Sequence, residues 1–165
     1  MRVVVITISD KGFRGERSDE SGPLLKRLVT EMGAEVIATH ILPDEPEQIA
    51  ALLAELADSG EVDLIVTTGG TGPSPRDQTP EATQCVIERE MPGLAELLRW
   101  EGYQHTPFAV LSRGVSGIRG QTLIVNLPGS PKAVQEGMGV LTPLLPSAIA
   151  LIKDEAPMDG LCTPQ

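Results

Sequence analysis

The segment VDLIVTTGGTG, residues 62–72, joins a run of apolar and β-branched residues directly to a glycine-rich turn. Such a run is typical of a strand that is buried on both faces of a parallel sheet, so we expect a central strand over Val62–Thr68. The first nine residues, MRVVVITIS, have the same pattern and predict a second central strand over Arg2–Ser9. Each strand is followed by a polar loop and then by a helical pattern, which is the alternation of an α/β protein.

The flanking sequence extends this alternation in both directions. Apolar periodicity, helix-starting prolines and glycine stops predict helices over residues 24–32, 49–59 and 79–90, from Pro92 to Trp100, and after Pro131. Further strands are expected over Val36–Leu42, Phe108–Leu111 and Thr122–Leu127, with residues 112–121 as a connecting loop. We therefore predict one domain over residues 1–153, with a mainly parallel sheet covered by helices on both faces, and a loose tail over residues 154–165.

Composition excludes several classes of function. The formal net charge is −10, and 165 residues contain only two Phe, one Trp and one Tyr, so we expect no nucleic-acid binding through phosphate contacts or base stacking. We expect a cytoplasmic location, because residues 1–9 lack the pattern of a secretory signal, and no membrane span, because Leu141–Ile152 is short and contains two prolines. Cys85, Cys162, His40 and His105 have no spacing typical of a disulfide or a zinc site.

Three glycine-bearing loops follow apolar strands and are expected at the carboxyl edge of the sheet, where open α/β proteins bind their ligands. They cover residues 9–22, 69–77 and 128–131. This distribution suits an anionic small molecule, since backbone amides beside glycine approach phosphate closely; the alternative is that Arg and Gly are simply common in loops. Seven cationic residues lie in these loops or in the one before the last strand: Lys11, Arg14, Arg17, Arg76, Arg113, Arg119 and Lys132.

Two acidic residues have two interpretations each: Asp77, in the loop after Val62–Thr68, and Asp44, in the loop after Val36–Leu42. Asp77 lies between prolines at a helix start, where it is either a loop or capping residue or, beside a phosphate, a ligand of Mg²⁺. Asp44 lies three residues before Glu47, a spacing that capping explains without any chemistry. If strand order brings Asp44 and Asp77 to one edge, the two carboxylates can hold a metal, and the spacing does not decide between these alternatives.

Several ordered motifs together resemble the MogA/MoaB family of molybdenum cofactor biosynthesis, which includes the gephyrin G domain, over about residues 3–153. The motifs that carry the resemblance are TISD (7–10), DESGP (19–23), PDE (43–45), TTGGTG (67–72), PRDQTPEA (75–82), GIRG (117–120) and NLPGSP (126–131). The resemblance implies a three-layer α/β/α domain with a mainly parallel, mixed sheet. It also implies a homotrimer.

The resemblance assigns functions to individual residues. It makes Asp44 and Asp77 catalytic and Mg²⁺-binding, in preference to capping. It implies that the remaining site residues contact the nucleotide or the pterin phosphate: Ser9, Asp10, Asp19, Ser21, Gly22, Gly69, Gly70, Thr71, Gly72, Arg76, Arg119, Asn126, Pro128, Gly129 and Ser130. Pro73 and Gly114 depart from the family, in which a larger apolar residue and a Ser on the pterin side are common at these positions.

The implied activity is molybdopterin adenylyl transfer, in which AMP passes from MgATP to the terminal phosphate of molybdopterin and diphosphate is released. The product is then expected to be handed over to a molybdenum insertase. An alternative is a non-catalytic molybdopterin-binding or scaffold protein of the MoaB branch. A third possibility, the related domain of competence-damage proteins, is disfavoured because those chains usually carry a further domain.

Overall fold

The apolar runs of the sequence form the centre of a single six-stranded sheet in the computed structural model, which describes residues 1–155. The strand order is β2-β1-β3-β6-β5-β4; the first four strands are parallel, and β5 is antiparallel to both of its neighbours. The predicted mainly parallel, mixed sheet is therefore confirmed. The strands are β1 (Arg2–Ile8), β2 (Glu35–Leu42), β3 (Leu64–Thr68), β4 (Arg89–Glu90), β5 (Ser116–Arg119) and β6 (Thr122–Leu127).

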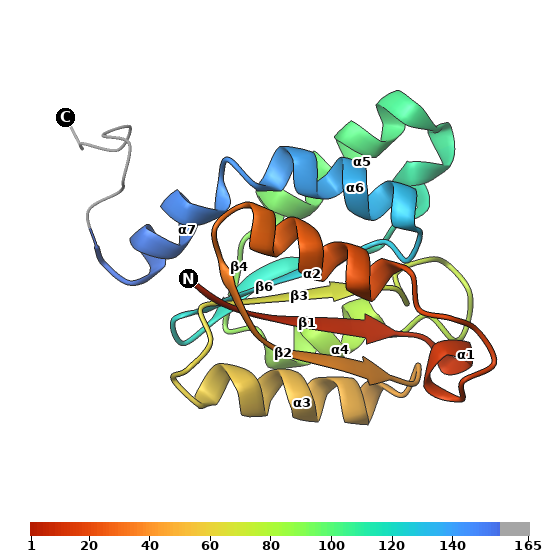
Figure 1. Cartoon of the computed structure of the whole chain (residues 1–165), viewed down its shortest axis with the longest axis horizontal. Coiled ribbons are helices and arrows are strands. Elements are labelled where there is room, and N and C mark those ends of the chain that lie inside the picture. The colour runs from red at the N-terminus through yellow and green to blue at the C-terminus, as the bar shows by residue number, and fades with distance from the viewer. Residues whose placement is uncertain (156–165) are drawn as a thin grey trace.

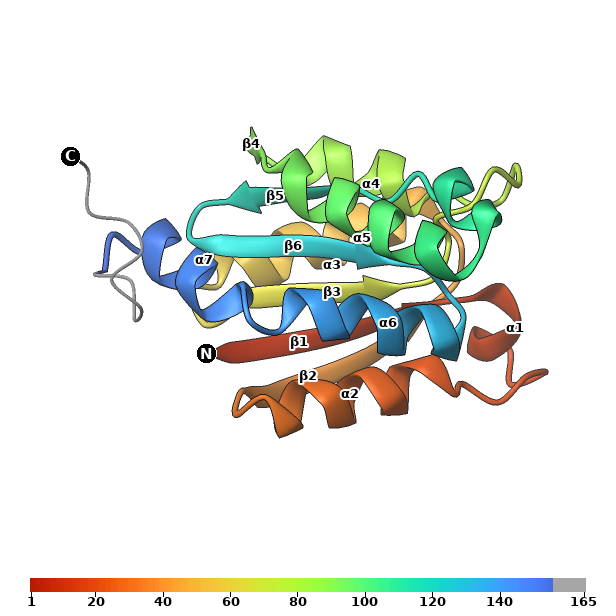
Figure 2. The same ribbon diagram turned by 90° about the horizontal axis from the view of Figure 1, so that it is seen from above.

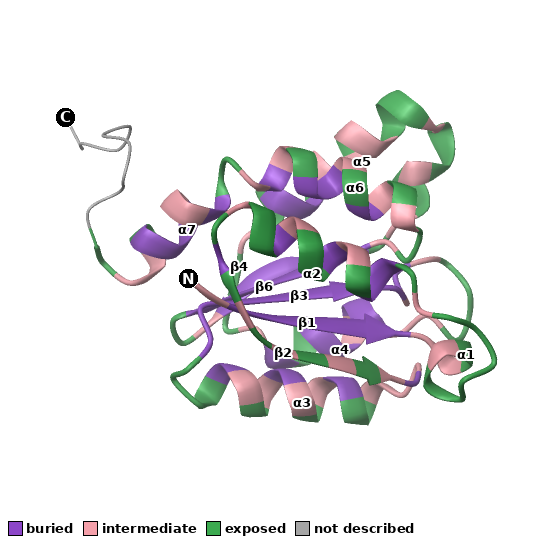
Figure 3. Cartoon of the chain, in the orientation of Figure 1, coloured by how far each residue is buried: buried purple, intermediate pink, exposed green. Residues whose placement is uncertain are grey.

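Helices cover both faces of the sheet and give the predicted three layers (Figures 1 and 2). Side chains alternate along β1, so that Val3 and Val5 pack in the core under one helical layer and Val4 and Ile6 in the core under the other. Figure 3 shows the resulting buried centre. One layer contains α2 (Ser21–Glu31), α5 (Pro92–His105), α6 (Pro131–Leu141) and α7 (Leu145–Ile152), and the other contains α3 (Pro46–Asp58) and α4 (Thr79–Val86).

The strand order creates a switch point between β1 and β3. From β1 the chain passes through α2 to β2 on one side, then returns through α3 to β3 on the other side of β1. The loops that leave the carboxyl ends of β1 and β3 therefore diverge and open a crevice between them, which is where sheets of this kind bind ligands. A one-turn helix, α1 (Asp10–Phe13), follows β1 directly at this edge.

The structure corrects several of the predicted elements between residues 79 and 121. Residues 107–111 form a 3₁₀ helix, η1 (Pro107–Leu111), instead of a strand, because Pro107 starts it and the Thr106 hydroxyl accepts a hydrogen bond from the Phe108 amide. The missing strand is β5, inside the segment predicted as a loop. The helix that starts at Thr79 ends at Val86, after which Arg89–Glu90 forms β4, and the helix that starts at Pro92 extends to His105.

The apolar residues around Leu94 and those within residues 141–152 contribute to the core. Leu94 is buried, and the same cluster contains Leu98, Leu141, Leu145, Ala148, Ile149 and Ile152. Of the predicted tail, residues 156–165 with Cys162 lie outside the described residues, and Cys85 is free and exposed on α4. Within residues 1–155, none of the helices has the length and apolar content needed to cross a membrane.

Candidate functional site

Two adjoining pockets open at the carboxyl edge of the parallel strands. The larger has a volume of about 530 Å³ and the smaller about 420 Å³. Both are lined by Gly70, Asp77, Gly129 and Ser130, which we call the shared wall. Ligands in the two pockets would therefore meet at a wall made of two glycine loops, one carboxylate and the start of α6.

The loop after β3 requires its glycines. Gly69 and Gly70 have φ angles of +100° and +67°, a region that L side chains rarely adopt, and a Cβ at Gly69 would lie 2.2 Å from the Ile8 carbonyl oxygen. Thr79, which begins α4, holds this loop, because its hydroxyl donates to the Gly69 carbonyl (3.0 Å) and its amide donates to that of Gly70 (3.1 Å). The two glycines therefore pack against the end of β1, and the hydrogen bonds from Thr79 hold them to the start of α4.

Hydrogen bonds tie the other two loops together behind the shared wall. Asp19 accepts a hydrogen bond from the Thr7 hydroxyl (2.7 Å) and another from the Gly22 amide (2.9 Å). The Ser21 hydroxyl donates to the Gly129 carbonyl (2.7 Å), and that of Thr68 donates to the Pro128 carbonyl (2.8 Å). The Asp19 carboxylate and the Ser21 hydroxyl are therefore engaged with the protein, and these residues shape the smaller pocket.

Asp10 and Asp44 bind each other's backbone. The Asp10 amide donates to the Asp44 carboxylate and the Asp44 amide donates to the Asp10 carboxylate, both at 3.0 Å. The Arg76 guanidinium, which also contacts Glu45, donates to both Asp10 oxygens at 3.0–3.1 Å. Burial alone would raise the pKa of Asp10, but the Asp44 amide and the Arg76 charge hold that pKa below its ordinary value. Asp10 is therefore an ionised anchor for the loop after β2.

The carboxyl of Asp44, unlike that of Asp10, has a pKa above its ordinary value. Burial raises the pKa of its carboxyl, and the negative charges of Asp10 and Asp77 add to this shift, which the Asp10 amide and Arg76 only partly offset. The capping interpretation of Asp44 is wrong, because Glu45 is the N-cap of α3 and makes no side-chain capping bond. Asp77 does not cap α4 either; its carboxylate accepts a bond from the Ser74 amide (3.3 Å) within the loop.

The donor set fits a magnesium ion that is shared with a phosphorylated ligand. Asp44 and Asp77 both line the smaller pocket, and carboxylate oxygens are the protein ligands that Mg²⁺ prefers. Magnesium usually takes one or two protein carboxylates and completes its shell with water and phosphate oxygens. Within residues 1–155 no cluster of three or more His, Cys, Asp or Glu side chains is suited to hold a metal without such help.

Three further predicted residues have structural partners. Ser9 and Ser130 cap α1 and α6, because their hydroxyls accept bonds from the Gly12 amide (3.0 Å) and the Ala133 amide (3.1 Å). Asn126 is 1% exposed, and its side-chain amide donates to the hydroxyls of Thr67 and Thr83 at 3.0 Å each. Its carboxamide oxygen accepts a hydrogen bond from the Val115 amide. Both ends of the Asn126 carboxamide are therefore bonded, which fixes the end of β6 just before the shared wall.

Arg119 does not reach the site, and its placement at the ligand edge is wrong. Because β5 runs antiparallel to β6, Arg119 pairs with Thr122 at the start of β6, which is the opposite edge of the sheet. There its guanidinium binds the Asp58 carboxylate at 2.8 Å. The structure brings the other predicted site residues together at the carboxyl edge. Of the predicted cations, Arg17 lines the smaller pocket, and it forms no ion pair with any residue in the described part of the chain.

Arg113 holds the loop that carries Asp77, a role that the sequence did not reveal. Its amide donates to the Thr71 carbonyl (2.7 Å), and its guanidinium donates to the carbonyls of Gly72 (2.9 Å) and Asp77 (2.6 Å) and pairs with Glu81. The bond from Arg113 lowers the pKa of the Glu81 carboxyl. Arg113 thus fastens both ends of residues 71–77 to the loop that follows η1.

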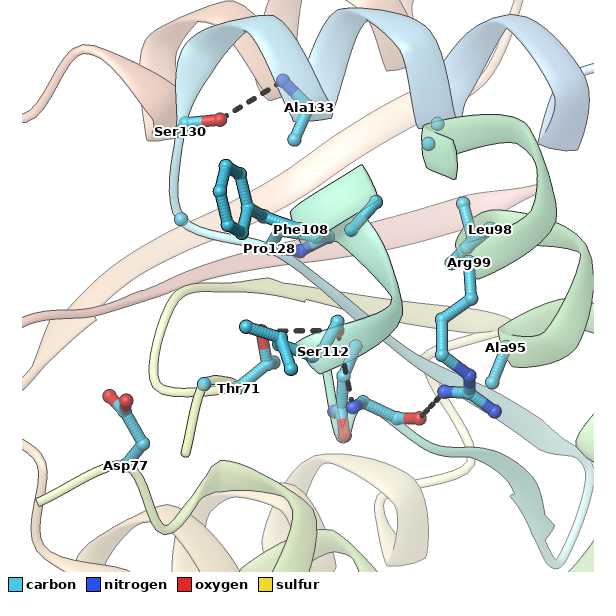
Figure 4. A pocket seen from close by; sticks show the side chains of 18 of the residues that line it. Thr71, Asp77, Ala95, Leu98, Arg99, Phe108, Ser112, Pro128, Ser130 and Ala133 are labelled. Carbon is cyan, nitrogen blue, oxygen red and sulfur yellow. Dashed lines mark hydrogen bonds between the residues drawn. The ribbon is translucent and has the colours of Figure 1, made fainter. Parts of the chain in front are cut away.

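The larger pocket extends from the shared wall between α5, η1 and α6 (Figure 4). Apolar groups from all three elements line most of it, and the Phe108 ring lies beside Pro128 near the shared wall (Figure 4). Arg99 donates to the Gly114 carbonyl at 2.9 Å. A Cβ at Gly114 would lie 3.1 Å from the Asn126 carbonyl oxygen, so the lack of a side chain lets residue 114 pack closely against β6 at this side of the larger pocket. Glu136 of α6 is the pocket's second carboxylate besides Asp77.

Fold and site together define a class: three-layer α/β/α proteins with a ligand site at the switch point of a mainly parallel sheet. Residues 4–147 match the family described as "Probable molybdopterin binding domain". The chain is 38% identical over 154 residues to molybdopterin adenylyltransferase of Helicobacter pylori strain J99, covering 92% of this chain and 88% of that protein. The chain therefore belongs to this family of molybdenum cofactor biosynthesis domains.

Two further comparisons support the same family assignment. The Drosophila melanogaster molybdenum cofactor synthesis protein cinnamon is 45% identical over 152 residues, which are 92% of this chain but only 25% of that longer protein. The crystal structure of the molybdopterin biosynthesis enzyme MoaB from Thermus thermophilus superposes with a TM-score of 0.88 at 50% identity, covering 93% of this chain and 97% of that one. The predicted family is confirmed.

Proposed function

We propose that this protein is a molybdopterin adenylyltransferase that transfers AMP from ATP to the terminal phosphate of molybdopterin. The main support for this function is the shared wall, where the two pockets meet at Gly70, Asp77, Gly129 and Ser130. Adjoining pockets of this kind suit two ligands that react with each other. The bacterial relatives that align with most of the chain, and that carry this enzyme name, support the same activity.

The transfer requires positioning and charge stabilisation more than covalent chemistry from the protein. An oxygen of the molybdopterin phosphate attacks the α-phosphorus of ATP, the bond from that phosphorus to the bridging oxygen breaks, and diphosphate leaves with the electron pair. Backbone amides of residues 70–72 and of the start of α6, which Ser130 caps, supply partial positive charge for the phosphates, whereas the Gly69 amide is already bonded to the Leu127 carbonyl. The loops on either side orient the two ligands.

Asp44 and Asp77 are the residues that would hold Mg²⁺ in this proposal, because both line the smaller pocket. When bound, the ion neutralises phosphate charge that these carboxylates would otherwise repel. Arg76 is already bonded to Asp10 and Glu45, so its role is to keep Asp10 ionised and the Asp44 loop in place.

The decisive experiment is incubation of the purified protein with MgATP and molybdopterin, followed by measurement of diphosphate and of adenylylated pterin. Stoichiometric formation of both products supports the enzyme. Tight molybdopterin binding without diphosphate release would favour the alternative, a non-catalytic binding or scaffold protein. The acidic loop residues that such a protein would be free to lose, Asp44 and Asp77, are present and face one pocket.

We further propose a cytoplasmic homotrimer that passes its product to a molybdenum insertase. An exposed apolar face on α5 and η1 supports subunit association, since a cyclic oligomer must bury a surface of this kind. The face consists of Trp100, Tyr103, Phe108, Val110 and Leu111, each at least half exposed. Sedimentation should give about three times the 17.5 kDa chain mass, and a monomer at micromolar concentration would contradict the proposal.

A further inference from the structure

One side of the larger pocket is held without any fully buried side chain. It is formed by the second half of α5, by η1 and by the loop that follows, residues 96–113, which we call the outer wall. None of these residues is buried, whereas the facing helix α6 contributes Val134 and Met138 to the core. Segments with few buried contacts open at a lower free-energy cost than the core, so the position of the outer wall depends largely on its polar contacts.

The outer wall meets α6 through an apolar contact and a polar one. At the apolar contact, Gly137 of α6 lets Leu98 of α5 approach, since a Cβ at Gly137 would lie 2.8 Å from the Leu98 side chain. At the polar contact, His105, the last residue of α5, lies 3.5 Å from the Glu136 carboxylate of α6. Within residues 1–155 this is the only contact between ionisable side chains of α5 and α6, so it is the polar tie that holds the end of α5 to α6.

His105 lies between two carboxylates. Its Nε2 atom is 3.0 Å from Glu101, one turn earlier on α5, and its Nδ1 atom faces Glu136. A neutral imidazole has one N–H and one lone pair, so one of its nitrogens would turn a lone pair toward a carboxylate oxygen. The protonated ring donates from both nitrogens, and therefore only this form satisfies both carboxylates.

Another cation offers Glu136 a second partner. Lys132, one turn earlier on α6, lies 3.8 Å from the carboxylate oxygen that faces His105, and the Lys132 side chain is 74% exposed. The third element at this end of the pocket, η1, contains no ionisable residue. Glu136 can thus pair with His105 across the pocket or with Lys132 along α6, and the charge on the imidazole decides which pairing is favoured.

We propose that His105 is a proton-controlled clasp that holds the outer wall against α6 and loosens as the pH rises. Imidazole side chains change charge between about pH 5 and about pH 8, so the clasp is closed at the acid end of this range and open at the other. Its path to the pocket is short, because the hydroxyl of the next residue, Thr106, accepts the bond from the Phe108 amide that begins η1. The Phe108 ring lies beside Pro128 near the shared wall (Figure 4). The clasp would control access to the larger pocket whatever its ligand, so this inference goes beyond the proposed function and does not rest on it.

The test is amide hydrogen exchange of the full chain between about pH 5.5 and about pH 8, followed by mass spectrometry on the peptide that contains residues 106–112. The amides of Phe108, Ala109 and Ser112 donate hydrogen bonds within this segment. After correction for the intrinsic effect of pH on exchange, we expect the protection in wild type to fall about threefold to tenfold as the pH rises, the size expected when two partly exposed ion pairs are lost. His105→Gln, which carries no charge, should show the low protection throughout, and His105→Lys, which stays charged, the high protection throughout.

His40→Gln is the matched control, because His40 on β2 is the only other histidine of the chain, and this variant should keep the pH dependence of wild type. Constant protection in wild type, the same fall in His105→Gln as in wild type, or no fall in His40→Gln would overturn the proposal. Sedimentation of the same samples checks subunit association, since η1 belongs to the exposed apolar face. A fall in protection that only follows a loss of sedimenting mass would also overturn it. Absence of adenylyl transfer is a separate result that contradicts the proposed function alone.

Discussion

Removing the Arg113 guanidinium should reduce catalysis far more than stability. Arg113→Met keeps the apolar part of the side chain but loses the bonds to the carbonyls of Gly72 and Asp77 and the pair with Glu81. Hydrogen bonds from a charged donor are each worth about 1.5–3 kcal/mol when buried. The Arg113 side chain is 38% exposed, so we discount these values and expect a loss of about 1–2 kcal/mol of unfolding free energy.

The catalytic loss has a different origin. Without the Arg113 guanidinium, Gly72 and Asp77 are no longer fastened to the loop after η1, although the backbone amide of residue 113 still binds the Thr71 carbonyl. Asp77 can then move relative to the shared wall. A displacement of about 1 Å at a reacting centre costs on the order of 100-fold in rate. We therefore expect kcat for diphosphate release to fall about 100-fold, with a smaller change in the KM for molybdopterin, because Asp77 acts mainly in the transition state.

The assay is steady-state diphosphate release at saturating MgATP, with urea unfolding of the same preparations. Glu81→Gln is the control, since it retains the bonds from Arg113 to the backbone and removes only a half-exposed charge pair; it should keep kcat within about threefold of wild type. A kcat for Arg113→Met within that same range would refute the reasoning. So would a fall in kcat that matches the fraction of unfolded protein.

Three other substitutions test the acidic groups. Asp77→Asn should lower kcat more than pterin affinity, and wild-type kcat at saturating Mg²⁺ would exclude a metal-binding role. Asp44→Asn should abolish turnover yet melt higher than wild type without ligand at about pH 7. The pKa of Asp44 is raised, so its contribution to stability is present below its ordinary value of 3.8 and lost as the pH rises through the raised pKa; thermal scans at about pH 3 should show no difference. Asp63→Asn should cost about 3 kcal/mol, because Asp63 is a buried partner of Lys153 and Arg2. Burial opposes ionisation of Asp63, but these cations lower its pKa, so the stabilisation is present above pH 3.8 and lost as the pH falls through the lowered pKa, and urea titrations should converge in acid.

The central strands were predictable because burial on both faces leaves a continuous apolar run, as in residues 64–68. The strand β5, near the edge of the sheet, was not predictable from the sequence. The strand β5 has four residues, one of them glycine, and its pairing with β6 depends on tertiary contacts that no local pattern records. The error in placing Arg119 has the same cause: a glycine-flanked arginine looks like part of a ligand loop, but an antiparallel strand puts its end at the opposite edge of the sheet.

The candidate site was predictable where it depends on short motifs and not where it depends on packing between distant segments. Gly69, Gly70 and Asp77 lie together because one strand end determines their position. Arg113 is 36 residues from Asp77, and Glu136 reaches the larger pocket only because α6 packs beside α5. Neither residue stands in a pattern that distinguishes it from an ordinary helix or loop charge, so only the folded chain reveals the contacts that matter.

The distribution of ion pairs explains how a protein with a net charge of −10 can receive two phosphorylated ligands. Four of the six predicted cations at the ligand edge are already paired: Arg14 with Glu16, Arg76 with Asp10 and Glu45, Arg113 with Glu81, and Lys132 with Glu136. These pairs position loops and contribute little net charge to the pockets. The anion affinity must then come from backbone amides, helix starts and a divalent ion at Asp44 and Asp77, so ligand binding should depend on Mg²⁺ much more steeply than on monovalent salt.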